Sequence, residues 1–129
     1  MKIGTTSFGF RYAFLDPANS PTFVEMIRQA REAGVERLQI CESTRPLEVS
    51  KSGWREALRC AADLGVEIQL GCKALKPEIV ERYITLAHEL ACNQLRIVME
   101  DPDHHERATR ENATRLLADI VPKLQSAGM

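Results

Sequence analysis

Two stretches of this sequence decide its fold: Ala33-Gly34-Val35-Glu36-Arg37-Leu38-Gln39-Ile40-Cys41 and, one repeat later, Leu64-Gly65-Val66-Glu67-Ile68-Gln69-Leu70-Gly71-Cys72. In each, an amphipathic segment ends at a glycine and a short β-rich run begins, which is typical of a helix that stops and passes into a strand. A fainter copy is Ala91-Cys92-Asn93-Gln94-Leu95-Arg96-Ile97-Val98, where asparagine replaces the glycine. The repeating unit is therefore helix, turn, strand.

The repeat predicts four strands, over residues 2–7, 37–42, 67–72 and 94–99, with a helix after each strand. The first helix is expected to start at Ser20-Pro21, the second after Ser50 or Ser52, the third at Lys76-Pro77, and the fourth to cover about 106–127. Within the fourth, Pro122 removes one helical hydrogen bond and is expected to kink or shorten the last turn.

Strands that alternate with helices run parallel and are joined by right-handed crossovers. Such a chain forms either an open doubly wound sheet or part of a (β/α)8 barrel. The loop after the first strand, residues 8–14, has one glycine, Gly9, and so lacks the Gly-rich turn of a nucleotide-binding sheet. At the other end Gly128-Met129 repeats the register of Gly34-Val35, where a strand begins. A whole barrel takes about 250 residues, so the sequence predicts an α/β fold of four βα units, a half-barrel in one domain over 1–129, with the fifth strand onward absent.

Composition excludes several classes of protein. The 129 residues carry 17 Lys and Arg against 18 Asp and Glu, a formal charge of −1 that gives no reason to expect nucleic acid or an anionic membrane surface as a partner. No apolar run approaches the roughly 18 to 20 residues of a membrane span, and no signal peptide is visible, so the expected location is cytoplasmic. The four cysteines form no C-x-x-C pair and are expected to be buried, reduced thiols.

Three segments carry a family resemblance: KIGTTSF over residues 2–8, LQICE over 38–42, and LRIVMEDPDHH over 95–105. In these segments the chain resembles the N-terminal half of the sugar phosphate isomerase/epimerase family, whose fold is the xylose-isomerase-like TIM barrel. The resemblance implies a divalent-metal enzyme, using Mn, Zn, Mg or Co, that moves a proton and a carbonyl along a sugar or polyol.

The family's metal ligands come mainly from strands five to eight. The resemblance therefore implies no cofactor site within this chain and an isolated chain that is inactive as an isomerase or epimerase. The alternative is a half-barrel without catalysis, which acts as an assembly module or a small-molecule-binding module.

Candidate site residues lie where the strands end, because the βα loops of a parallel array converge at the C-terminal ends of its strands. The loop after the first strand holds Phe8, Phe10, Arg11 and Tyr12, which are predicted to stack on a sugar and to bind a polar or anionic group. The equal alternative is that these aromatic rings cover the barrel mouth or pack under the first helix.

Strands two and three end in Glu42 and Lys73. The carboxylate of Glu42 suits a substrate hydroxyl or acid–base work, but it equally suits pairing with Arg45 or capping a helix. Lys73 suits neutralisation of a phosphate or simple solvation.

Strand four ends in Glu100-Asp101-Pro102-Asp103-His104-His105-Glu106. We predict that Glu100 acts as an acid or base and that His104 contacts the substrate. Glu100, Asp103 and His104 are also weak candidates for a metal site, since carboxylate and imidazole are ligands of Mn, Zn and Fe. Asp103 equally fits as the N-cap of the fourth helix.

Four parallel strands leave two unpaired edges and an open inner face. Burying such a face is worth about 25 cal/mol per Å² of apolar area. We therefore predict a homodimer in which two copies complete or cover the barrel.

Overall fold

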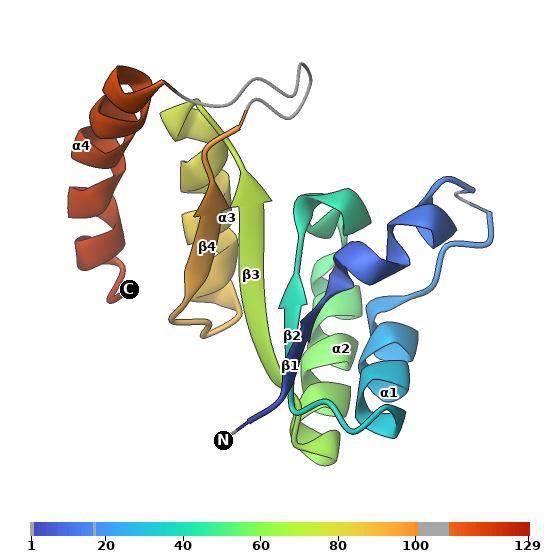
Figure 1. The fold of residues 1–129 in the computed structure, drawn as a ribbon. Coiled ribbons are helices and arrows are strands. Elements are labelled where there is room, and N and C mark those ends of the chain that lie inside the picture. The colour runs from blue at the N-terminus through green and yellow to red at the C-terminus, as the bar shows by residue number, and fades with distance from the viewer. Residues whose placement is uncertain (1, 17, 101–108) are drawn as a thin grey trace. The chain divides into compact units, whose positions relative to one another are not determined.

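The computed structural model describes residues 2–16, 18–100 and 109–129. Its strands form one sheet in the order β1-β2-β3-β4, with parallel pairing (Figure 1). The strands are β1 (Gly4–Thr6), β2 (Arg37–Ile40), β3 (Glu67–Lys73) and β4 (Leu95–Val98). The α-helices are α1 (Phe23–Glu32), α2 (Lys51–Leu64), α3 (Pro77–Glu89) and α4 (Arg110–Ser126). The 3-10 helices are η1 (Ser7–Phe14), η2 (Glu42–Thr44) and η3 (Pro46–Glu48). The predicted fold class, half of a TIM barrel, is confirmed.

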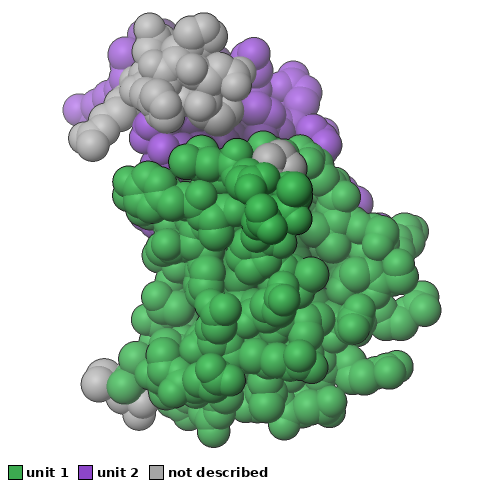
Figure 2. All heavy atoms as spheres, turned by 90° about the vertical axis from the view of Figure 1, so that its right-hand side faces the viewer, with its two compact units in different colours: residues 1–69 green, residues 70–129 purple. Residues whose placement is uncertain are grey.

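The chain divides into two compact units, coloured separately in Figure 2. Unit 1 comprises residues 1–69 and unit 2 comprises residues 70–129. Strand β3 contributes to both, because its first three residues belong to unit 1 and the rest to unit 2.

The core of unit 1 lies between its strands and its two α-helices. Leu38 of β2 and Met26 of α1 are fully buried. The rings of Phe23 and Trp54 stack with their centroids 4.8 Å apart, and the Trp54 indole Nε1 donates to the Pro46 carbonyl over 3.2 Å. The indole is therefore both packed and hydrogen-bonded, as a buried tryptophan requires.

Helix α1 begins two residues later than the Ser20-Pro21 prediction. Its N-cap is Thr22, whose hydroxyl accepts from the Glu25 amide while the Glu25 carboxylate accepts from the Thr22 amide, a complete capping box. The Ser20 hydroxyl donates instead to the Asp16 carbonyl over 3.0 Å. The reciprocal bonds at Thr22 satisfy two amide donors and so outcompete the single cap that Ser20 would make.

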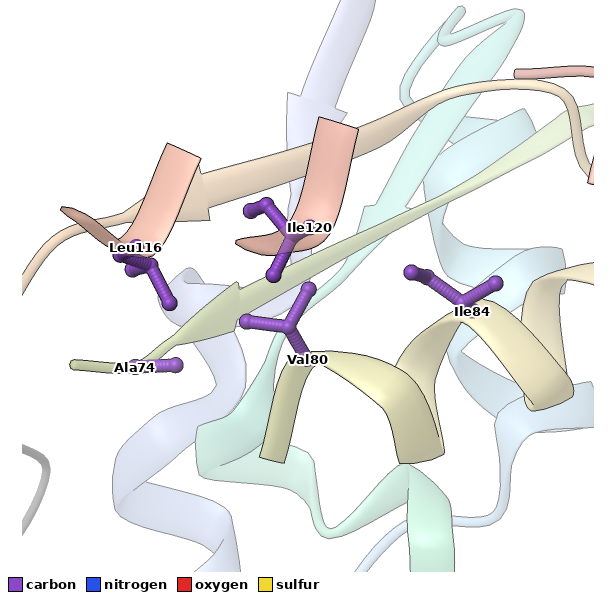
Figure 3. Close-up of a cluster of buried hydrophobic side chains, with 5 residues drawn as sticks. All are labelled: Ala74, Val80, Ile84, Leu116 and Ile120. Carbon is purple, nitrogen blue, oxygen red and sulfur yellow. The ribbon is translucent and has the colours of Figure 1, made fainter. Parts of the chain in front are cut away.

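The core of unit 2 is a cluster of buried aliphatic side chains from α3, α4 and the residue that follows β3, and these side chains point toward one another (Figure 3). Its members are Ala74, Val80, Ile84, Leu116 and Ile120. On helix α4 the buried pair sits four residues apart, which is the spacing that places side chains on one helical face.

Helix α4 begins later than the predicted residue 106 and ends at Ser126, next to the predicted end at 127. Its N-cap is Thr109, not Asp103, because the Thr109 hydroxyl accepts from the Asn112 amide. Pro122 lies inside the helix, which continues to Ser126. The other two predicted starts are confirmed, with Ser50 as the N-cap of α2 and Pro77 as the first residue of α3.

The cysteines are free thiols, and three of them, Cys41, Cys72 and Cys92, are buried. Cys60, in α2, is half-buried. The predicted burial is therefore confirmed for three of the four, and the reduced state stays a prediction.

The strand face of unit 1 opposite the helices is polar. Side chains alternate along a strand, so Arg37 and Gln39 point away from the side on which Leu38 is buried. On β3, the Glu67 carboxylate lies 3.1 Å from Arg37 Nη2 and also accepts from Gln69 Nε2 over 3.2 Å. Burying these charged and amide groups between two copies would yield little hydrophobic gain, and the homodimer stays a prediction.

These contacts lower the pKa of Glu67 and predict a pH dependence. The hydrogen bond from Arg37 and then that from Lys2 hold the pKa of the Glu67 carboxyl below its ordinary value of 4.5. A folded pKa below the unfolded one stabilises the fold above pH 4.5, and this stabilisation is lost as pH falls through the folded value. Because the carboxylate is one-third exposed, water screens the pair and its contribution is below about 1 kcal/mol.

We expect Glu67→Gln to lower the free energy of unfolding at pH 7 by up to about 1 kcal/mol, and to have a smaller effect at pH 3, where protonation of the carboxyl is more advanced. Urea denaturation at both pH values measures the difference. Glu32→Gln, at an exposed position on α1, is the control and should change stability at neither pH. An equal loss for Glu67→Gln at both pH values would contradict the assignment.

Candidate functional site

The strand ends of unit 1 are held together by a buried hydroxyl network. The Ser7 hydroxyl, just after β1, accepts from the Cys41 amide, just after β2, over 2.8 Å. Thr44 donates its hydroxyl to the Cys41 carbonyl over 2.8 Å and lies 3.3 Å from the Ser7 hydroxyl. Ser7 and Thr44 are almost fully buried. The network therefore ties the loop after β1 to the loop after β2, and it positions the residues that follow.

The loop after β1 is the 3-10 helix η1, and it gathers three of the four side chains predicted there. The Arg11 guanidinium carbon lies 4.3 Å from the centroid of the Phe8 ring and 4.2 Å from that of the Tyr12 ring. Arg11 Nη2 donates to the Tyr12 hydroxyl over 2.8 Å, and Nη1 donates to the Phe8 carbonyl over 3.3 Å. Because these contacts fix the guanidinium in one orientation, Arg11 is preorganised rather than freely solvated.

The two rings remain accessible. Phe8 is 42% exposed and Tyr12 is 67% exposed. They are therefore not buried under the first helix, which was one form of the alternative, whereas the other form, in which the rings cover the barrel mouth, stays a prediction. Phe10 and Phe14 are half-buried, and Phe14 lines a cavity of about 420 Å³ together with Phe23 and Val24 of α1. That alternative therefore fits Phe14 better than it fits Phe8 and Tyr12.

Glu42 opens η2 directly after β2, and its side chain is half-buried. The Arg45 amide bonds to the Glu42 carbonyl, but within the described part of the chain no ion pair joins their side chains. Arg45 adopts a left-handed conformation, with φ of 52°, and is exposed. The alternative in which the Glu42 carboxylate pairs with Arg45 is therefore not found among the described residues.

The strand ends of unit 2 bring together two predicted residues, Lys73 and Glu100. Strands β3 and β4 pair with Lys73 opposite Val98, and Glu100 follows two residues after Val98, with its amide donating to the Val98 carbonyl over 2.9 Å. Lys73 Nζ lies 3.2 Å from Glu100 Oε1, with the two side chains 22% and 16% exposed. Because the pair is partly desolvated, the attraction between its two charges is stronger than in a surface pair. The pair also places an ammonium beside a carboxylate.

The described residues do not fit a divalent metal. Among residues 2–16, 18–100 and 109–129, no group of three His, Cys, Asp or Glu side chains is placed to hold an ion. At Glu100 the Lys73 ammonium already occupies one carboxylate oxygen and repels a second cation. The predicted residues Asp103 and His104 lie outside the described residues.

Sequence reasoning missed the Ser7–Thr44 network, although a signal was present. Serine directly after a strand and threonine three residues after Cys41 are both short hydroxyl side chains that bond nearby backbone groups. The bond between Ser7 and the Cys41 amide joins residues 34 apart in the chain. Only the pairing of β1 with β2 brings those residues together.

Within the described part of the chain, no helix is both long and apolar enough to cross a membrane.

Comparisons with known proteins agree with this fold. No family model matches the chain. The chain is 25% identical over 126 residues to 3-oxo-isoapionate decarboxylase of Pectobacterium atrosepticum, and the match covers 97% of this chain and 45% of that protein. Its structure is similar to D-psicose 3-epimerase of Clostridium cellulolyticum H10, solved with D-tagatose, with a TM-score of 0.65, 14% identity, and coverage of all of this chain and 50% of that one.

The chain thus spans about half the length of the proteins it matches. The resemblance to half of a xylose-isomerase-like barrel is confirmed, and the comparison with the epimerase structure shows the fold alone.

Proposed function

We propose that the chain forms the first four βα units of a barrel enzyme that acts on a sugar or a related polyhydroxylated carbonyl compound. The observation that carries the proposal is the Lys73–Glu100 pair at the ends of adjacent strands. Ligands of parallel βα folds bind at this edge of the sheet. An ammonium and a carboxylate offer a substrate hydroxyl or carbonyl both a donor and an acceptor.

The names of the two similar proteins describe reactions that share a chemical step. Epimerisation beside a carbonyl breaks a C–H bond, and loss of CO2 from a 3-oxo acid breaks a C–C bond. In both reactions the freed electron pair moves onto the carbonyl oxygen and gives an enolate. Catalysis then requires a positive group near that oxygen and a group that transfers a proton at carbon.

In this proposal Lys73 stabilises the developing negative charge on the substrate oxygen, and Glu100 accepts or donates the proton. Their direct contact supports this division of roles, because it places an ammonium donor and a carboxylate acceptor side by side. The described residues do not fit a metal ion, so no step of the proposal passes through one. Self-association of two copies belongs to the same proposal and stays a prediction.

Titration of the 15N-labelled chain with D-tagatose, followed by NMR, tests the proposal. We expect saturable shifts of the amides of Lys73, Ala74 and Glu100. Glu100→Gln should weaken binding about tenfold, since a hydrogen bond to a charged group contributes roughly 1.5–3 kcal/mol. Glu81→Gln, which removes the Glu81–Lys123 pair between α3 and α4, is the matched control and should leave binding unchanged.

Absence of binding, or equal weakening by both variants, would contradict the proposal. Incubation with D-tagatose, followed by product analysis, separates an enzyme from the second candidate, a binding module. Turnover that is lost in Glu100→Gln supports the enzyme, and binding without turnover supports the module.

A further inference from the structure

We propose that a cavity in unit 1 binds a small aromatic amine, a molecule with an aromatic body and one cationic amino group. All residues that line the cavity lie between Phe14 and Glu56, so it shares no residue with the Lys73–Glu100 pair. The proposal therefore goes beyond the proposed function and does not depend on it. The cavity is called the Phe14 cavity below.

The Phe14 cavity has the size and the lining of a small-molecule site. Its volume is about 420 Å³, and pockets for small ligands measure roughly 300–1,000 Å³. Its apolar lining consists of Phe14, Pro21, Phe23, Val24 and Val49. These residues come from η1, from the start of α1 and from the segment before α2. Because two of them carry phenyl rings, an aromatic ligand is removed from water and meets other rings.

The walls of the cavity are held in place by contacts behind them. The Phe23 ring stacks on Trp54 with 4.8 Å between the centroids. At the start of α2, a Cβ on Gly53 would lie only 3.0 Å from Val49 Cγ1, so the helix backbone already packs closely against Val49. Because these contacts restrict Phe23 and Val49, the cavity is largely preformed, and binding costs little reorganisation.

The opening of the cavity carries a negative charge. The charged side chains that line the cavity, Glu25, Arg28 and Glu56, are exposed and therefore lie at its opening. Two carboxylates against one guanidinium leave an excess of one negative charge. Glu25 also counters the partial positive charge that the first turn of α1 presents. The opening therefore favours a cation over an anion.

The two carboxylates differ in what holds them. Glu25 Oε2 accepts from the Thr22 amide over 2.7 Å and from the Thr22 hydroxyl over 2.8 Å. These bonds, the amide first, hold the pKa of the Glu25 carboxyl below its ordinary value of 4.5, so Glu25 is ionised at pH 7 and committed to its cap. Among the described residues, no ion pair engages the Glu56 carboxylate. Glu56 is therefore the group that binds the ammonium of a ligand whose ring fills the cavity.

Three probes that share a phenyl ring test the proposal: 2-phenylethylamine, 2-phenylethanol and phenylacetate. Their binding to the 15N-labelled chain is followed by the amides of Val24 and Gly53. It is also followed by the indole Nε1–H signal of Trp54, which is unique because the chain has one tryptophan. We expect the amine to bind about fivefold more tightly than the alcohol, since an exposed ion pair contributes up to about that factor. Phenylacetate should bind most weakly, because its carboxylate meets a negative opening.

Two variants separate the apolar part of the site from its charge. Val24→Phe should weaken the binding of the amine and the alcohol by about tenfold or more, because the new ring takes the space that the ligand needs. Glu56→Gln should abolish the preference for the amine without weakening the binding of the alcohol. The matched controls are Val121→Phe, at an exposed position on α4, and Glu32→Gln, at an exposed position on α1. Neither control residue lines the cavity, so neither change should affect binding.

Equal affinity for the three probes, tightest binding of phenylacetate, or absence of saturable binding would overturn the proposal. It would also be overturned by an amine preference that survives in Glu56→Gln, or by unchanged binding in a Val24→Phe variant that circular dichroism shows to be folded. If Val24→Phe does not fold, Glu56→Gln decides alone, because it changes an exposed side chain. The titration with D-tagatose reports on Lys73 and Glu100, so the proposed function stands or falls separately.

Discussion

Replacing Ile120 by alanine is expected to lower the free energy of unfolding of unit 2 by about 2–5 kcal/mol. Ile120 is fully buried and belongs to the cluster that joins α3, α4 and Ala74, the residue after β3 (Figure 3). Alanine removes three carbon atoms from a packed interior, so the loss combines a transfer free energy with the cost of a cavity. Because net stabilities of domains are about 5–15 kcal/mol, this single change removes a large share.

Leu117 is the matched control for Ile120. It lies on the same helix, three residues earlier, but is 42% exposed. We expect Leu117→Ala to cost less than about 1 kcal/mol, as substitutions on exposed surface usually do. Urea denaturation of both variants, with amide hydrogen exchange over residues 70–129, measures the difference. Equal losses would show that α4 does not pack through the face that contains Ile120.

Replacing Ser7 by alanine is expected to lower the free energy of unfolding by about 1–3 kcal/mol. The change removes the acceptor of the Cys41 amide, which donates to the Ser7 hydroxyl over 2.8 Å. Both groups are buried, so the amide is left without an acceptor, and burial of an unsatisfied donor costs more than the loss of an average hydrogen bond.

The Ser7 variant should also change the loops that the network supports. We expect the Nε–Hε signal of Arg11 to broaden in Ser7→Ala, because η1 begins at Ser7. Ser52→Ala is the control: Ser52 is exposed and bonds only to the Ser50 hydroxyl, so its loss should cost less than about 0.5 kcal/mol. An unchanged stability of Ser7→Ala would mean that the Cys41 amide finds another acceptor.

The glycine-terminated repeat predicts much of the fold. Each predicted strand overlaps an observed one, and the starts at Ser50 and Pro77 follow from local capping and the fixed φ of proline. The sequence did not decide at which residue α1 starts, because Ser20 and Thr22 are both good N-caps. The reciprocal bond from Glu25 decides in favour of Thr22.

The candidate site was only partly predictable. Glu42, Lys73, Glu100 and the η1 aromatics could be named, since they follow strands and the ends of parallel strands carry function. That Lys73 contacts Glu100 could not be predicted, because it depends on the register in which β3 pairs with β4. The polar character of the unit 1 strand face depends in the same way on which residues alternate toward the helices.

The sequence by itself determined the order of helices and strands, their parallel pairing and the resemblance to half a barrel. These properties follow from local rules, namely hydrophobic periodicity, helix stops and crossover handedness. Only the tertiary structure decided which charges meet. It joined Lys73 to Glu100 and Ser7 to the Cys41 amide across separations of 27 and 34 residues, because contacts between distant residues depend on strand register and loop conformation, which no local pattern specifies.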